Sequence, residues 1–161
     1  MKVIERYDLA FDKKEGVKMK NIIIKSIQSR IKETIGNENV IICGVSALEC
    51  LNLFSGYFET DAVYVYALSQ GRNTALKYNL VPSFENIETV MCNGLICTSV
   101  NQTFNDLLFN YEKIDDIALL EALSNYYHMH GQTFDELSLS GRNIAVFKSI
   151  EQSAIMYHCG G

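Results

Sequence analysis

Apolar positions in the first part of the chain recur with helical spacing. Ile24, Ile27, Ile31 and Ile35 are three or four residues apart, and charged side chains occupy the opposite face. This pattern predicts an amphipathic helix over residues 18–35 that ends at Gly36, with its apolar face on the core. A groove on a partner protein is the alternative position for that face. Residues 1–17 are polar and mixed in charge, which predicts an N-terminal arm.

Short runs rich in β-branched and aromatic residues follow this helix. Residues 40–43 and 62–67 are such runs, which predicts two buried strands. Gly44 ends the first run. Ser46 is then predicted to cap a short helix over residues 46–53, with Glu49 at the capping-box position.

An Asn-Gly pair predicts a β-hairpin formed by residues 88–92 and 95–99. Both central residues of a two-residue turn need a positive φ, which Asn93 and Gly94 tolerate. This register places Cys97 opposite Val90 and makes Cys92 and Cys97 diagonal neighbours on one face. We interpret them as packed thiols, because no Cys-x-x-Cys spacing supplies further zinc ligands.

Helical patterns dominate the rest of the chain. Ser99 is a predicted cap for a helix over residues 101–112, and a second helix is predicted over residues 115–130. The apolar stripe expected on the first is Phe104, Leu107, Leu108 and Tyr111. The stripe expected on the second is Ile117, Leu120, Leu123 and Tyr127. Thr133 begins a further capping-box pattern, and residues 144–159 fit either a helix or a strand followed by a helix.

These elements together predict an α/β or α+β fold, with a small mixed sheet that contains an antiparallel hairpin and is covered by several helices. We expect residues 18–161 to form a single domain after the arm at 1–17. The length of 161 residues and the 48% of hydrophobic residues are those of an ordinary globular domain.

The net charge and the composition of individual segments argue against some classes of function. The chain has 14 Lys and Arg against 19 Asp and Glu, a net charge of -5, whereas a free-standing DNA-binding protein is usually basic. No apolar stretch reaches the length of a membrane span, and the N-terminus has no secretory h-region. The five cysteines are therefore expected to be reduced, in a cytoplasmic protein.

Catalytic patterns are not found along the chain. No glycine-rich phosphate loop occurs, and the spacing of the carboxylates forces no pair together. His128 and His130 are two residues apart and so face different ways on a helix, and His158-Cys159 lies in a glycine-ended tail. We therefore expect neither an enzyme nor a bound metal or cofactor.

Three stretches, in order, resemble the C-terminal region of the AbiEi antitoxin family of abortive-infection toxin–antitoxin systems. Residues 44–53 resemble its Ser-Ala-Leu helix, and residues 61–69 resemble its hydrophobic strand. Residues 93–108 resemble its Thr-Ser/Thr-Pro-x-x-Thr-x-x-Asp-Leu-Leu pattern, with the following helix at 117–127. The resemblance covers roughly residues 40–138.

Five residues carry the match and are candidate partner-binding or motif residues: Ser46, Leu48, Thr98, Thr103 and Asp106. Thr103 and Asp106 are three residues apart in a helix, where they either support the junction or contact a partner. Val100 and Asn101 replace the family's usual Pro-Glu, and Gln102 replaces its usual Arg.

The resemblance implies a protein that neutralises a nucleotidyltransferase-like toxin in phage defence. Family members join this region to an N-terminal winged helix-turn-helix that binds DNA, but the first 40 residues of this chain offer one clear helix. We therefore expect the toxin-neutralising half alone, with a protein partner. An acidic inhibitor of a nucleic-acid-handling defence enzyme is one alternative, and a transcriptional regulator is another. A metal-dependent nuclease or nucleotidyltransferase relic that uses Asp106 is a third. Contact of residues 1–40 with DNA is left open.

Overall fold

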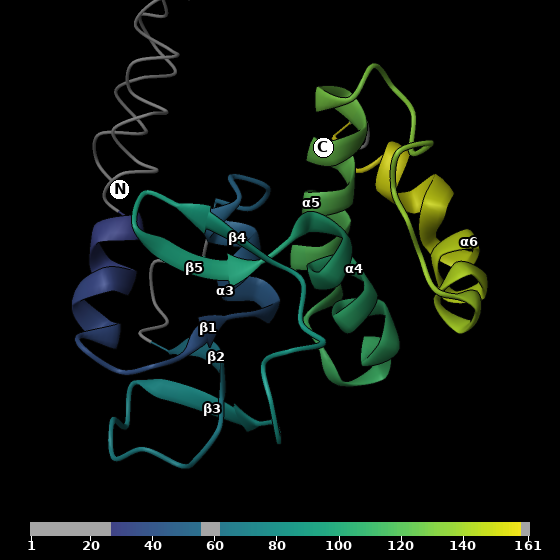
Figure 1. Ribbon diagram of the computed structural model, residues 1–161. Coiled ribbons are helices and arrows are strands. Elements are labelled where there is room, and N and C mark those ends of the chain that lie inside the picture. The colour runs from purple at the N-terminus through teal and green to yellow at the C-terminus, as the bar shows by residue number, and fades with distance from the viewer. Residues whose placement is uncertain (1–26, 56–61, 159–161) are drawn as a thin grey trace, which may run out of the picture.

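The computed structural model describes residues 27–55 and 62–158 and has an α/β fold, as predicted (Figure 1). Residues 27–35 are helical. The arm predicted at 1–17 and the first part of the helix predicted at 18–35 lie outside the described residues. The remaining elements are β1 (Ile41–Ile42), α3 (Gly44–Cys50), β2 (Val63–Ala67), β3 (Leu76–Leu80), β4 (Thr89–Cys92), β5 (Leu95–Thr98), α4 (Val100–Phe109), a 3-10 turn η1 (Tyr111–Lys113), α5 (Asp116–Met129) and α6 (Gly141–Ile155).

The five strands form one mixed sheet in the order β3-β2-β1-β5-β4. β1 runs parallel to β5, β2 runs parallel to β3, and the other two pairs are antiparallel. The register aligns Ile42 with Val65 and with Cys97, and all three side chains are buried on one face. The opposite face leaves Tyr64 and Ile96 exposed. The sheet is therefore covered on one face only along much of its length.

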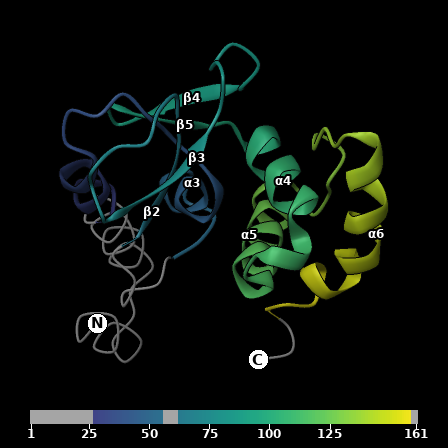
Figure 2. The same cartoon turned by 90° about the horizontal axis from the view of Figure 1, so that it is seen from below.

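The core has two parts, and α3 contributes to both. One part joins the covered sheet face to the helix at 27–35 and to Ala47 of α3. The other joins Leu48 of α3 to α4, α5 and α6, which lie together beside the sheet (Figure 2). Ala47 and Leu48, neighbours in one short helix, therefore contribute to different parts of the core.

The hairpin and its following helix agree with the predictions in detail. Val90 pairs with Cys97, as expected, and both Asn93 and Gly94 have positive φ values. The Ser99 hydroxyl accepts a hydrogen bond from the backbone N–H of Gln102 at 3.1 Å, which confirms the predicted cap of α4. Residues 141–155 form one helix, which settles the alternative left open for the C-terminal region.

Other local predictions are wrong, each for a physical reason. Ser46 is not a cap, because α3 already begins at Gly44 and the Ser46 hydroxyl bonds to β2. The Thr133 pattern begins a turn and not a helix, since its hydroxyl accepts from Asp135 N–H. Ile117 is exposed, and Ala118 and Leu119 face the core instead. β3 was not predicted at all.

Candidate functional site

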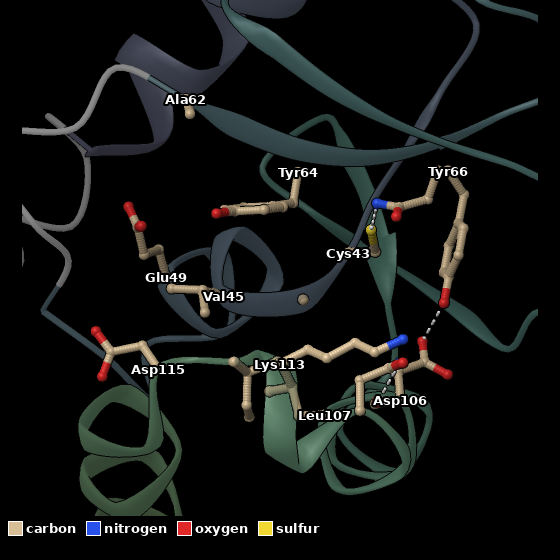
Figure 3. Close-up of a pocket in the computed structure, with 14 residues that line it drawn as sticks. Cys43, Val45, Glu49, Ala62, Tyr64, Tyr66, Asp106, Leu107, Lys113 and Asp115 are labelled. Carbon is tan, nitrogen blue, oxygen red and sulfur yellow. Dashed lines mark hydrogen bonds between the residues drawn. The ribbon is translucent and has the colours of Figure 1, made fainter.

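A pocket of about 530 Å³ lies where the sheet meets the helices (Figure 3). Its sheet side is formed by β2 and β3, and its other sides by the start of α3 and by the segment from α4 to the start of α5. The polar side chains that matter most in its walls are Cys43, Glu49, Tyr64, Tyr66, Asp106 and Lys113. A volume of this size is typical of sites that hold a small ligand or a partner's side chain.

Asp106 connects the helical side of the pocket to the sheet. Its Oδ2 accepts a hydrogen bond from the Tyr66 hydroxyl at 2.8 Å, and its Oδ1 accepts from Gln102 Nε2 at 2.9 Å. Burial raises the pKa of Asp106, and these two hydrogen bonds oppose the rise. Burial and the neighbouring Asp106 raise the pKa of Tyr66, so the phenol keeps its proton and remains the donor.

Thr98 and Thr103 lie behind Asp106 and are completely buried. Their hydroxyl oxygens are 2.6 Å apart, and the Thr103 hydroxyl also lies 2.6 Å from the carbonyl oxygen of Ser99, to which it donates. This pair ties the end of β5 to the first turn of α4. The two threonines therefore fix the junction and cannot contact a partner directly, whereas Asp106 of the same motif lines the pocket.

Ser46 and Leu48 support the junction from α3. The Ser46 hydroxyl accepts from the backbone N–H of Tyr64 at 2.9 Å, which fixes α3 against β2. Leu48 is completely buried in the helical part of the core. Of the five residues singled out in the sequence, only Asp106 lines the pocket.

Glu49 is a nearly buried carboxyl on the pocket wall. Burial raises the pKa of Glu49 to about 7, and Arg30 opposes the rise. The Arg30 guanidinium is 3.8 Å from the Glu49 carboxylate, which is a long ion pair. Glu49 was predicted as a capping residue, and its place in the wall follows from the packing of α3, which the sequence pattern did not indicate.

The cysteines of the described residues are packed thiols, as predicted. Cys97 is completely buried and its sulfur is 3.8 Å from that of Cys92, on one face of the hairpin. Burial raises the pKa of Cys43 in the pocket wall to about 12, and Asp106 adds to the rise. Within residues 27–55 and 62–158, taken together, no three histidine, cysteine, aspartate or glutamate side chains form a group that could bind a metal ion.

The histidines lie away from this pocket. His130 stacks on Tyr126 with ring centroids 4.0 Å apart, and His128 is exposed. Their different orientations agree with the prediction from their spacing. His158 bonds to Asn125, and Cys159 lies outside the described residues.

Sequence reasoning missed most of the pocket wall. Tyr64 and Tyr66 alternate with buried residues along β2, so the period of two already placed them together on the opposite face. Lys113 had no such signal, because η1 is a single turn between two helices.

Comparisons of the chain with protein-family models, with curated proteins and with solved structures find no match. The AbiEi resemblance therefore stays a prediction. In the described part of the chain, no helix has both the length and the apolar character needed to cross a membrane.

Proposed function

We propose that this chain is a non-catalytic, antitoxin-like protein that neutralises a nucleotidyltransferase-like toxin by binding to it. The observation that carries the proposal is spatial. The three separate stretches that resemble the AbiEi family meet at one junction, through side chains of those stretches.

Two hydrogen bonds make this junction across long sequence separations. Ser46 in the first stretch bonds to the backbone of Tyr64 in the second, and Tyr66 in the second bonds to Asp106 in the third. A family resemblance that reflects a shared structural unit expects contacts of this kind. The convergence of the three stretches therefore favours a shared structural unit over three unrelated likenesses.

Asp106, Cys43 and Tyr66 in the pocket wall favour binding over catalysis, whereas Glu49, with its pKa raised to about 7, is a wall group that could exchange a proton near neutral pH. Both oxygens of Asp106 already accept hydrogen bonds, which weakens it as a general base. The raised pKa values of Cys43 and Tyr66 keep the thiol and the phenol protonated, and a protonated thiol is a poor nucleophile. These groups can hold a ligand in place without exchanging protons with it.

A titration separates binding from enzymatic inactivation. A purified nucleotidyltransferase-like toxin encoded beside this gene is assayed with increasing amounts of the chain, and growth is followed on co-expression. The proposal expects toxin activity to fall in proportion to added chain and to end near equimolar amounts. Complete loss at a small fraction of one equivalent would identify a catalyst, and no loss in either assay would contradict the proposal.

An acidic surface supports a second candidate function, inhibition of a nucleic-acid-handling defence enzyme. Glu112, Asp115 and Asp116 are all exposed around the start of α5, and carboxylates there suit a basic nucleic-acid-binding groove. Inhibition of a defence nuclease that weakens at high salt, and that is lost when Asp116 and Glu112 are changed to lysine, would favour this second candidate. A salt-insensitive complex with the toxin would favour the first.

A further inference from the structure

We infer that the pocket between β2 and α4 receives an arginine side chain of the partner protein, with its guanidinium stacked on Tyr64. The identity of the partner rests on the proposed function, whereas the preference of the pocket for a guanidinium group does not. The ligand class assigned to this pocket is therefore a planar cation, the guanidinium group.

The walls of the pocket form a slot for a flat group. The Tyr64 ring is 42% exposed and lies over the pocket, and Val45 and Leu107 lie on the other side (Figure 3). Gly44 lies beside the base of the Tyr64 side chain, where an added Cβ would be 3.8 Å from the Tyr64 Cβ, an ordinary contact. A planar guanidinium stacks on an aromatic face better than a lysine ammonium does, since the latter is a compact, strongly hydrated charge.

The charges around the slot favour a cation. Among the described residues, three carboxyl groups line the pocket, from Glu49, Asp106 and Asp115, beside the ammonium of Lys113. The Arg30 guanidinium lies 3.8 Å from Glu49, so an incoming cation would share that carboxyl with it. Asp106 already accepts two hydrogen bonds, but a carboxylate offers about four lone-pair sites, so it can accept more. The same charge balance disfavours a phosphate group, which would meet carboxylates on most sides.

Lys113 places an ammonium group in the pocket. Its side chain runs along the pocket toward Asp106 and Tyr66 (Figure 3), although its residue is exposed and belongs to a short turn. An incoming guanidinium would meet this ammonium near Asp106 and would be repelled by it. Neutralising Lys113 should therefore strengthen binding, while neutralising Glu49 should weaken it.

The test uses N-acetyl-arginine amide as the probe and the full chain as the receptor. Titration is followed by the NMR signals of the Tyr64 and Tyr66 rings, with n-butylamine and inorganic phosphate as comparison probes. We expect saturable shifts with the arginine probe at millimolar concentration, weaker binding of the amine and none of phosphate.

Variants of opposite expected sign make the result specific. At pH 8, where most of the Glu49 carboxyl is ionised, Glu49→Gln should weaken binding of the arginine probe roughly two- to fivefold, and Lys113→Gln should tighten it by a similar factor. Glu85→Gln removes an exposed carboxylate outside the pocket wall and should change nothing. Tyr64→Leu should abolish the preference for guanidinium over amine.

Three outcomes would overturn the inference: no shift with the arginine probe, equal affinity for the amine, or identical affinities in the Glu49 and Lys113 variants. Failure of the proposed function gives a different pattern. If the probe binds but the toxin keeps its activity, the guanidinium site stands and the antitoxin role is lost. If the toxin is neutralised equally by all variants, the antitoxin role stands and the pocket is not where the partner's arginine binds.

Discussion

The sheet half and the helical half of the molecule bury their apolar side chains in different ways. The sheet half, made of the five strands and the helix at 27–35, buries one sheet face and leaves Tyr64 and Ile96 exposed on the other. The helical half, made of α4, α5 and α6, encloses a core in which Phe104 and Leu119 are completely buried. The difference is that the sheet half, although it has a buried core of its own, also provides an accessible face.

The candidate pocket lies on the boundary between the two halves. Its carboxyl groups come from α3 and from the helical half, and its aromatic wall comes from β2. At this boundary the packed helices hold the carboxyl groups in place, and the open sheet face leaves the pocket accessible. Both properties suit the binding of a partner's side chain. The predictions below test this division of roles, from the largest expected effect to the smallest.

The largest effect is expected in the helical core. Phe104→Ala removes a completely buried ring that contacts Tyr126 edge-on, and should lower the free energy of unfolding by about 3–5 kcal/mol. Ile96→Ala on the open sheet face, at 44% exposure, should cost less than about 1 kcal/mol. Urea denaturation measures both. Equal losses would remove the distinction between the halves.

Glu49 makes the boundary sensitive to pH. Its pKa rises from 4.5 in the unfolded chain to about 7 on folding, because burial disfavours the charged carboxylate. The contribution of the neutral carboxyl to the free energy of unfolding is therefore complete below pH 4.5 and is lost as the pH rises through 7. The free energy of unfolding falls by at most about 3 kcal/mol over this range. The pKa of about 7 already includes the opposing effect of the nearby Arg30 guanidinium.

Glu49→Gln replaces the carboxyl by a neutral group of the same shape. The variant should match the wild type near pH 4.5 and be more stable than it at pH 8, as measured by urea denaturation across that range. Glu85→Gln, which changes an exposed carboxyl, serves as the control. Parallel pH profiles for Glu49→Gln and the wild type would show that Glu49 is not desolvated on folding.

The threonine pair at the boundary should give a smaller loss with a characteristic non-additivity. Thr103→Val leaves the buried Thr98 hydroxyl without its partner, and should cost about 1–3 kcal/mol. Thr98→Val should cost less, because Thr103 still donates to the Ser99 carbonyl. The double variant should cost less than the sum of the single ones. Additive losses would show that the two hydroxyls do not depend on each other.

Sequence pattern predicted the parts of the fold that local signals determine. The hairpin follows from Asn93-Gly94, and the start of α4 follows from Ser99, whose hydroxyl acts within three residues. β3 was missed because Lys77 and Asn79 make it polar and because it pairs only at the edge of the sheet, with β2. Its position depends on a partner strand, which local propensity does not encode.

The site was less predictable, because its contacts join distant parts of the chain. Asp106 was recognised from its spacing and from the family resemblance, but its partner Tyr66 is 40 residues away. Ser46 was misassigned for the same reason, since its hydroxyl bonds to a strand 18 residues away and not to its own helix. A local pattern can indicate that a polar residue has a role, but tertiary packing chooses the partner.

The hydrogen bond between Tyr66 and Asp106 is a second direct polar link between the halves, beside the Thr98–Thr103 pair, and its removal should have the smallest effect on stability. Tyr66→Phe should lower the free energy of unfolding by about 1 kcal/mol, because Asp106 keeps Gln102 and can be hydrated from the pocket. Tyr78→Phe is the matched control, since it loses a bond to Glu38 that lies outside the boundary. Both variants should fold, but only Tyr66→Phe should speed hydrogen exchange of the α4 amides. Equal exchange in the two variants would mean that the Tyr66–Asp106 bond does not contribute to holding α4 against the sheet.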